Sequence, residues 1–388
     1  MDNNDLVVVS EGEATIFYPP NNARLKYNAS EIFSRDLNFS SGNGLKSIRF
    51  FKEIPIDFKI TMNDFSKESC KLISKNANFN KLDNFNYEIT NYYNIEEFNE
   101  KFDIIDLEIY NNSPIKYLES AIKLLSNENG LLALTFPDMG ILAGNAYYDN
   151  CFATYGSIKL GNNDVTHESA IRIVLNTINL IASRHKKFIE PMISVYNNNY
   201  IKIYIQIIKN PLKAKNNAIK NSMMTFNCIN CGFLKNYYNY YSLNNNNSNN
   251  NNLFEFKFQC NYCKSLIPKM TGPFWAGAMH NSIFIEKLLT IYNNNDLNLN
   301  NLQVIKKIEL ILKELKEIPF FFKPSTLASI LKCPKTPSLL QFSNRLEQLG
   351  YNVSPTHCAS SALKTDAPWE TVCTVMEQFK AEIINYEN

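Results

Sequence analysis

Two acids near the end of one apolar stretch are the first candidates for chemistry. Asp106 and Glu108 lie in the segment Lys101–Pro114, KFDIIDLEIYNNSP. Its apolar, partly β-branched residues predict a buried strand, and the closing Asn-Asn-Ser-Pro predicts a turn that stops it. Ligands bind at the carboxyl ends of strands in open α/β sheets, so the two carboxylates are candidates for a site. The simpler interpretation of the stretch alone is a strand with two solvated acids, so the flanking segments decide.

A glycine turn and a further acid precede this strand. The sequence Ser-Gly-Asn-Gly allows a tight turn that approaches a ligand closely, and a helix with basic residues follows it. An acid then follows a predicted strand, at the position that holds ribose hydroxyls in nucleotide-binding folds. Each feature is weak evidence alone, but in this order they support each other. The candidates are Gly42, Gly44, Lys46, Arg49 and Asp64.

Strands and helices alternate through the first half of the chain. This alternation predicts an α/β fold with a parallel, doubly wound sheet, preceded by a short hairpin and followed by another. Ser66 is the expected N-cap of the helix after Asp64. The expected strands are 58–62, 102–107 and 131–136, the expected helices 67–78, 115–125 and 167–185, and the expected hairpins 6–18 and 191–208.

Four cysteines form two Cys-x-x-Cys pairs in the second half of the chain. They are Cys228, Cys231, Cys260 and Cys263. Four thiolates can surround zinc as a tetrahedron, and each pair supplies two ligands. The separation between the pairs is long, but an asparagine-rich insertion at 236–252 accounts for it. A structural zinc site is favoured over free thiols or a redox pair.

The C-terminal region reads as mostly helical. Helices are expected around 284–292 and 302–316, and a helix pair at 325–349 followed by a strand at 350–353 is a winged-helix pattern. The polar segment 354–369, which contains His357 and Lys364, is expected to form a loop before the last helix.

Composition limits the classes of function. The 388 residues carry a formal net charge of +2, so a nucleic-acid surface must be a local patch. No apolar run is long enough to span a bilayer, and the acidic N-terminus is unlike a targeting peptide. Nine cysteines without a secretory signal indicate an intracellular, reduced protein.

Many segments together carry a family resemblance. The chain resembles the tRNA (guanine-26) N2-dimethyltransferase family over nearly its whole length, and Thr-His-Cys followed by KTDAPW is the most specific match. The matching segments are EGEATIF, YNASEIFSRDL, SGNGLKSIRFFKEIP, MNDFSKES, FDIIDLEIYNNSP, NGLLALTFPDMGILAGN, TYGSIKLG, THESAIRIVL, GPFWAGAMH, KCPKTPSLL and LGYNVSPTHCASSALKTDAPWE.

The resemblance implies a Rossmann-like, S-adenosylmethionine-dependent methyltransferase domain over 1–210. It implies a family-specific α+β domain over 211–388, with the zinc knuckle and a winged-helix-like part. Members add one or two methyl groups to N2 of a guanine in tRNA. A monomer is expected, without a DNA or membrane partner, in the nucleus or cytoplasm more than in the mitochondrion. The implied cofactor contacts are Arg35, Gly42, Gly44, Lys46, Arg49 and Asp64; the catalytic acids are Glu108 and Asp106; the substrate contacts are Tyr110, His357 and Lys364.

The chain departs from the family pattern at three places, one of which is the acid near the cofactor adenine, expected around 92–94 and missing here. Glu108 stands where the family has the Asp of a D-P-F/Y-G motif, and the Pro and Gly of that motif are absent. Only residues 36–40 separate Arg35 from the glycine turn, where the family places a helix and the first strand of the sheet. Either the central strand is lost or the sequence lacks residues there. The alternative function is therefore a catalytically impaired RNA-binding homologue, and a weaker one is a methyltransferase with another substrate.

Overall fold

The structure is a computed structural model of the 388-residue chain. Three expected site residues, Arg35, Gly42 and Tyr110, lie outside the residues that it describes, as does most of the asparagine-rich insertion. None of the described helices combines the length and apolarity that a bilayer crossing needs. The described residues are 7–11, 13–18, 43–54, 58–82, 87–90, 98–109, 113–161, 164–197, 199–238, 259–266, 269–293 and 302–387.

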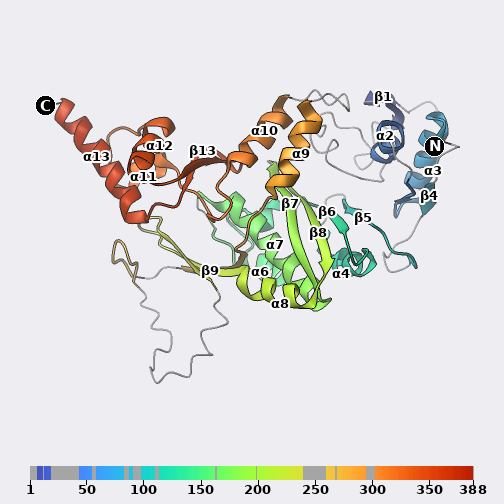
Figure 1. The fold of residues 1–388 in the computed structure, drawn as a ribbon, viewed down its shortest axis with the longest axis horizontal. Coiled ribbons are helices and arrows are strands. Elements are labelled where there is room, and N and C mark those ends of the chain that lie inside the picture. Colours follow the sequence, from blue (N-terminus) through green and yellow to red (C-terminus); the bar gives the residue numbers. More distant parts are fainter. Residues whose placement is uncertain are drawn as a thin grey trace, which may run out of the picture.

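The main sheet has four strands in the order β5-β6-β8-β7 (Figure 1). β5 (Ile104–Leu107) and β6 (Gly130–Phe136) are parallel, as expected from the alternation of strands and helices. β7 (Lys187–Asn197) and β8 (Tyr200–Lys209) form the predicted hairpin, and β8 pairs with β6 in the antiparallel sense. The sheet is therefore mixed, because the hairpin adds antiparallel strands to a parallel pair.

A second, smaller parallel pair lies apart from the main sheet. β3 (Ile60–Asn63) pairs with β4 (Tyr87–Thr90) in a separate two-stranded sheet. In an idealised doubly wound sheet the strands, numbered along the chain, lie side by side in the order 3-2-1-4-5. Here β3 and β4 correspond to the second and third strands of that order, and β5 and β6 correspond to the fourth and fifth. Among the described residues, no strand occupies the central position between β3 and β5. This agrees with the short spacing at 36–40.

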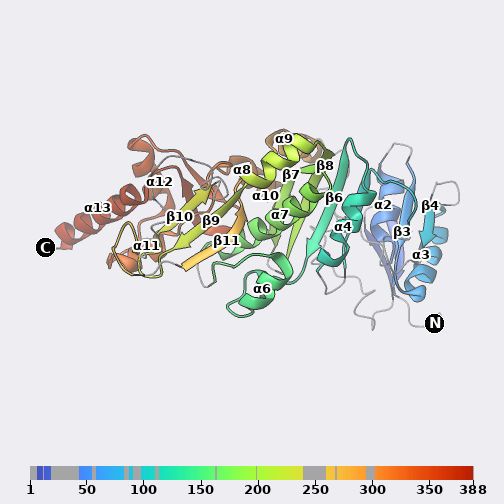
Figure 2. The ribbon, with the colours of Figure 1, turned by 90° about the horizontal axis from the view of Figure 1, so that it is seen from below.

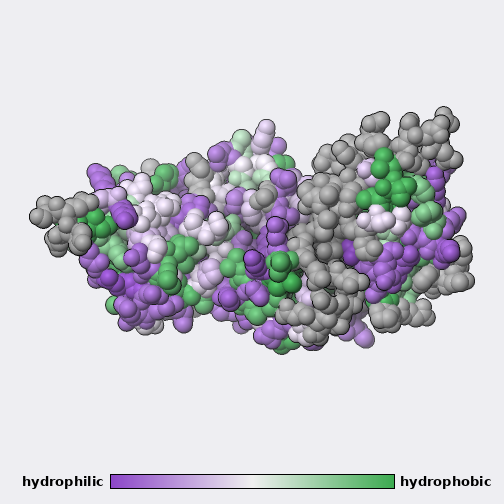
Figure 3. All heavy atoms as spheres, turned by 90° about the horizontal axis from the view of Figure 1, so that it is seen from above, coloured by the Kyte–Doolittle hydropathy of each residue, from purple (hydrophilic) through white to green (hydrophobic). Residues whose placement is uncertain are grey.

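Described residues 7–90 form a unit with its own apolar core, here called the N-terminal unit. The opening hairpin of β1 (Val7–Glu11) and β2 (Ala14–Tyr18) packs there with α2 (Leu45–Glu53) and α3 (Lys67–Phe79). Exposed apolar side chains over β1 form a hydrophobic patch at this end of the molecule, on the right in Figure 3.

Polar side chains fix α3 in this unit. The predicted N-cap is confirmed, because the Ser66 hydroxyl accepts a hydrogen bond from the Ser69 N–H. Near the other end of α3, the Asn76 amide bonds both backbone groups of Phe17 in β2, with the N–H donor 2.8 Å from the Asn76 oxygen. The opening hairpin is thus attached by directional bonds as well as by apolar contact.

α7 (Thr166–Arg184) is the central helix of the molecule and lies between β7 and β11 (Lys269–Trp275). Sequence periodicity predicts one apolar face, but the helix is buried on nearly all sides because both β-layers contact it. α4 (Ile115–Leu124) and α8 (Pro211–Lys220) pack against α7. α5 (Met139–Leu142) and α6 (Tyr148–Tyr155) follow β6, and α6 projects from the body in Figure 2.

The C-terminal half contains a second sheet and a helical part. The sheet has the order β10-β9-β11, and the 12-residue helices α9 and α10 follow it (Figure 2). The segment expected as a polar loop instead forms an antiparallel hairpin, β12–β13, so that prediction is wrong. The element bounds are β9 (Ser222–Asn227), β10 (Leu234–Tyr238), α9 (Ser282–Asn293), α10 (Leu302–Lys313), α11 (Pro324–Ile330), α12 (Leu339–Gln348), β12 (Val353–Thr356), β13 (Ala359–Thr365) and α13 (Trp369–Glu387).

The main apolar core crosses the expected domain boundary at 210/211. It contains residues of β5, β6 and α7 together with Met223, Phe274, Trp275 and Phe320 of the C-terminal half. The core of the N-terminal unit is separate from it. The division by packing therefore falls between the N-terminal unit and the rest of the described chain.

Candidate active site and metal centre

Glu108 lies at the carboxyl end of β5, the strand that the sequence pattern predicts. Its side chain is 26% exposed, and one carboxylate oxygen lies 2.5 Å from the Nζ of Lys46. Lys46 comes from the first turn of α2, in the N-terminal unit, and is itself almost fully buried. The structure therefore joins the candidate acid to the helix that follows the glycine turn.

Asp106 lies two residues earlier on β5, and its side chain is buried behind Glu108. Its Oδ1 accepts a hydrogen bond from Lys202 Nζ at 3.1 Å, and Lys202 also donates to the Thr135 hydroxyl at 3.0 Å. Burial raises the pKa of Asp106 and lowers the pKa of Lys202, and the attraction within the pair opposes both shifts. Only 4% of the Asp106 side chain is exposed. Direct contact with a substrate is not supported by this placement, because the Asp106 carboxylate is engaged by Lys202 inside the protein.

The glycine turn has the backbone that its sequence predicts. Gly44 has φ 84°, in the left-handed region, and a Cβ there would lie 3.3 Å from Ile73 of α3. No side chain caps the N-terminus of α2 at Gly44, although Asn43 Oδ1 accepts a hydrogen bond from the Leu45 N–H. Glycine is thus required here, and the start of α2 presents backbone N–H groups.

Two expected cofactor contacts are engaged within the protein. The guanidinium of Arg49 forms two hydrogen bonds to the carboxylate of Glu53, at 2.7 and 2.8 Å. The carboxylate of Asp64 is buried at the carboxyl end of β3 and accepts the Ser66 N–H at 2.9 Å. Asp64 therefore helps to begin α3, whereas the glycine turn packs against Ile73, further along the same helix.

A second polar group lies at the end of β6, the strand next to β5. The Tyr155 hydroxyl donates a hydrogen bond to Asp138 and lies 2.8 Å from the Ser113 hydroxyl. Burial raises the pKa of Asp138, and the Tyr155 hydroxyl opposes that shift. Sequence reasoning did not single out these residues. The sequence nevertheless contains a pattern that could have identified Asp138 as a candidate, because Asp138, like Glu108, is an acid that follows a predicted strand.

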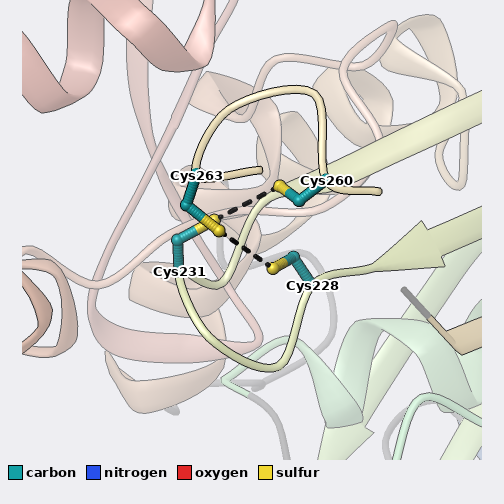
Figure 4. Close-up of side chains that lie close together, drawn as sticks. All are labelled: Cys228, Cys231, Cys260 and Cys263. Carbon is teal, nitrogen blue, oxygen red and sulfur yellow. Dashed lines mark hydrogen bonds between the residues drawn. The ribbon is translucent and has the colours of Figure 1, made fainter. Parts of the chain in front are cut away.

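Four thiols converge from the two Cys-x-x-Cys pairs, as Figure 4 shows. Their Sγ atoms all lie within 4.8 Å of one another, and the Cys228–Cys263 and Cys231–Cys260 distances are both 3.6 Å. A zinc tetrahedron with Zn–S bonds of about 2.3 Å has S–S edges of about 3.8 Å, so the thiols fit zinc. Burial raises the pKa of Cys263, but hydrogen bonds from Asn230 and Ser265 outweigh it and lower the pKa to about 5, which favours a thiolate.

His357 and Lys364 do not face solvent. Each side chain is at most 1% exposed, and both contact Glu314, which follows α10: His357 Nδ1 lies 2.6 Å from one carboxylate oxygen and Lys364 Nζ lies 2.8 Å from the other. Lys364 also lies 3.0 Å from Glu168 of α7, which in turn binds Arg172 at 2.8 Å. This placement does not support a substrate contact. The two residues belong to a buried charge network that connects α7 to the β12–β13 hairpin.

His280 joins His357 and Glu314 in a group whose ligand atoms lie within 4.8 Å of one another. A metal is nevertheless disfavoured by the hydrogen bonds. The Ser194 N–H donates to His280 Nδ1 at 3.2 Å, so the ring proton lies on Nε2, the nitrogen that a metal would need. The ammonium of Lys364 beside Glu314 adds electrostatic repulsion against a cation.

Comparison with known proteins decides the family. The model of the family described as N2,N2-dimethylguanosine tRNA methyltransferase matches residues 23–377. The chain belongs to this family.

Relatives within the N2,N2-dimethylguanosine tRNA methyltransferase family match most of the chain. The mitochondrial tRNA (guanine(26)-N(2))-dimethyltransferase of Saccharomyces cerevisiae is 31% identical over 372 residues, covering 90% of this chain. The chain spans only 64% of that relative's own length. The tRNA (guanine(26)-N(2))-dimethyltransferase of Thermococcus kodakarensis is 27% identical over 409 residues, covering 96% of this chain and 99% of the relative.

A solved structure shares the fold. Trm1 from Pyrococcus horikoshii, in complex with S-adenosyl-L-methionine, superposes with a TM-score of 0.78 at 20% identity. The superposition covers 95% of this chain and 99% of the archaeal one. The α/β fold expected from the sequence is therefore confirmed.

Proposed function

We propose that this member of the N2,N2-dimethylguanosine tRNA methyltransferase family is an S-adenosylmethionine-dependent enzyme that methylates N2 of guanine 26 in tRNA. The family membership and the names of the relatives support this proposal. The structural observation that carries it is Glu108, a partly exposed carboxylate at the carboxyl end of β5 that is joined to α2 through Lys46. Ligands bind at this edge in open α/β folds.

The chemistry requires a carboxylate more than a strong base. The lone pair of a guanine amine is delocalised into the ring, so the amine is a weak nucleophile. A fixed carboxylate that accepts an N–H hydrogen bond orients the amine and increases its electron density. We assign this role to Glu108, which lies two residues beyond the buried Asp106 and contacts Lys46.

Lys46 forms an ion pair with Glu108. Its ammonium lies 2.5 Å from one oxygen of the Glu108 carboxylate and orients that group. The same contact competes with the substrate for the carboxylate, so we expect Lys46 to move when guanine binds. The longer arm of glutamate, compared with the aspartate of the family motif, gives the carboxylate room to follow.

The residues for S-adenosylmethionine come from the N-terminal unit. The uncapped start of α2 after Gly44 and the carboxylate of Asp64 would hold the cofactor, whose sulfonium supplies the methyl group. The left-handed turn, which a Cβ would crowd against Ile73, fits a backbone that approaches a ligand closely. Arg35 and Gly42 belong to the same proposal through the resemblance.

The C-terminal half supplies the remaining parts of the proposal. Cys228, Cys231, Cys260 and Cys263 would hold a structural zinc ion, because four protein thiolates leave no open coordination position. The order α11, α12 and the β12–β13 hairpin fits a winged-helix-like element, which we assign to tRNA binding.

Cofactor binding is the first test. Saturating S-adenosylmethionine should raise the melting temperature of the purified chain, because a ligand that binds only the folded state stabilises it by mass action. Mass spectrometry of tRNA nucleosides after incubation should then show N2-methylated guanine. An unchanged melting temperature together with unmodified tRNA would refute the proposal.

A catalytically impaired RNA-binding protein is the second candidate. The observation that favours it is the unoccupied central strand position between β3 and β5 among the described residues, where the fold normally supports the cofactor turn. For this candidate, the chain should bind tRNA with the steep salt dependence of phosphate contacts, but should show no stabilisation by S-adenosylmethionine.

A further inference from the structure

A cavity of about 860 Å³ lies between the segment 143–167 and residues of the C-terminal half. Its walls come from the segment after β6 with the start of α6, from the end of β9 with the first cysteine pair, and from the segments around α11 and α13. Its volume falls in the range of about 300–1,000 Å³ that small-ligand pockets occupy. The methyl-transfer proposal does not use this cavity.

Aromatic rings form part of its lining. Tyr148, at the start of α6, is 40% exposed and lines the cavity, as does Trp369 at the start of α13. The ring of Tyr148 is held in place because Lys159 Nζ lies 5.1 Å from its centroid, and its hydroxyl occupies the space that a Cβ at Gly161 would need. Such exposed but fixed rings are platforms on which bases stack.

Two residues of the lining carry a polar atom without a partner. Among the described residues, neither Asn227 Oδ1 nor Trp369 Nε1 has a hydrogen-bond partner, and both atoms are covered by neighbouring atoms, so a ligand in the cavity reaches them only once side chains move. Buried polar groups in folded proteins are nearly always paired, so these two call for an explanation. One atom is an acceptor and the other is a donor, and a nucleobase edge offers the matching donor and acceptor.

Cations complete the set. Lys269 and Lys323 line the cavity, and Lys323 is only partly neutralised by Asp164, 3.3 Å away with 30% of the lysine side chain still exposed. Stacking rings, an unpaired donor and acceptor, and ammonium groups together match a nucleotide: base face, base edge and phosphate.

The cavity also lies on the relevant side of the sheet. The segment after β6, which lines it, leaves the sheet at Asp138, next to the carboxyl end of β5 that presents Glu108. We propose that this cavity binds an unpaired nucleotide of the RNA substrate, distinct from the methylated guanine, with Tyr148 stacking on its base and Trp369 donating to its edge. The inference rests on the proposed function, because it takes tRNA as the ligand.

Tyr148→Ala and Trp369→Phe test the proposal in the full chain. Fluorescence anisotropy with an unmodified tRNA transcript should show binding weakened by about 5-fold to 150-fold for Y148A, from the loss of one stacked base. W369F removes the indole N–H together with the five-membered part of the ring, and loss of the N–H donor should weaken tRNA binding by about 2-fold to 12-fold. The smaller ring leaves space beside Phe322 and should lower the melting temperature somewhat, so binding is compared well below the melting transition.

Phe152→Ala is the matched control, since Phe152 is an exposed ring on α6 that does not line the cavity. F152A and Tyr148→Phe should both bind tRNA as the wild type does. Crosslinking of tRNA that carries 4-thiouridine should label peptides containing Tyr148 or Trp369.

The outcomes separate the two proposals. If the wild type binds and methylates tRNA but Y148A and W369F bind equally well, the nucleotide pocket is refuted and the proposed function stands. Crosslinks confined to other surfaces would likewise refute the nucleotide pocket and leave the proposed function standing. A wild type that binds no tRNA at all overturns both.

Discussion

The resemblance implies that Lys364 contacts the substrate, whereas the structure places it in a buried charge network. The substitution Lys364→Met distinguishes these two roles. The buried ammonium lies between the carboxylates of Glu168 and Glu314, at 3.0 and 2.8 Å. Its removal leaves two buried acids that have lost their shared ammonium, although Arg172 still contacts Glu168 and His357 still contacts Glu314. Loss of one partner from a buried ion pair costs about 3–5 kcal/mol of unfolding free energy.

This loss of unfolding free energy corresponds to a decrease in melting temperature. An unfolding entropy of about 2.1 cal/mol/K per residue gives roughly 0.6–0.8 kcal/mol/K for a cooperative unit of roughly 300 to 400 residues. K364M should therefore melt about 4–8 °C below the wild type, as measured by calorimetry. Lys316→Met is the control, because Lys316 is exposed and lies in the same region.

Acid should remove the difference between wild type and K364M. Burial would raise the pKa of Glu314, but His357 and Lys364 outweigh it and hold the pKa well below its usual value. A carboxyl with a lowered pKa in the folded state stabilises the protein above its unfolded pKa of about 4.3, and this stability is lost as the pH falls further. The melting gap should thus be full at neutral pH and should narrow below about pH 4.

The tRNA affinity of folded K364M decides between the two roles. A structural lysine predicts unchanged tRNA binding at a temperature well below the melting transition. If K364M melts within about 1 °C of K316M and binds tRNA more weakly, the network argument is wrong and the substrate contact expected from the resemblance is right.

Three other predictions concern separate sites. Glu108→Gln should lower the methylation rate by about 100-fold or more, while S-adenosylmethionine should still raise the melting temperature of the variant. Glu108→Asp, which introduces the acid of the family motif, should keep more activity than Glu108→Gln. A methylation rate of Glu108→Gln equal to that of the wild type would refute the assigned role. Cys231→Ser should lower both the zinc content, by elemental analysis, and the melting temperature, whereas retained zinc would contradict a four-thiolate site. Lys202→Met should cost about 3–5 kcal/mol of unfolding free energy by removing the ammonium beside the buried Asp106 carboxylate, and adding Asp106→Asn should restore part of this in denaturant titrations.

Local patterns predicted much of the fold. The N-cap at Ser66, the strand that ends at Glu108 and the helix that follows the glycine turn all depend on neighbours within a few residues. The convergence of the thiols also follows from short spacing within each pair, despite the long insertion between them. Such features need no knowledge of the tertiary structure.

Ion pairs between residues far apart in the chain could not be predicted from the sequence. Asp106 reads as a solvated strand end, but Lys202, 96 residues later, buries and neutralises it. The polar residues of β12 and β13 resemble a loop, but Lys364 and His357 find acids on α7 and after α10. In both cases a partner from a distant segment compensates the buried charge. The charged residue type alone predicts an exposed side chain, and that prediction is wrong here.

The separate core of the N-terminal unit has a consequence for thermal inactivation. The glycine turn and Lys46 flank Leu45 of that small core, while Glu108 follows Leu107 of the large one. A two-stranded sheet contributes little stability by itself. On heating, the methyl-donor side should therefore detach from the acceptor side while α7 and the main sheet remain intact. Turnover would then cease several degrees below the calorimetric transition, and a bound methyl donor would narrow that interval.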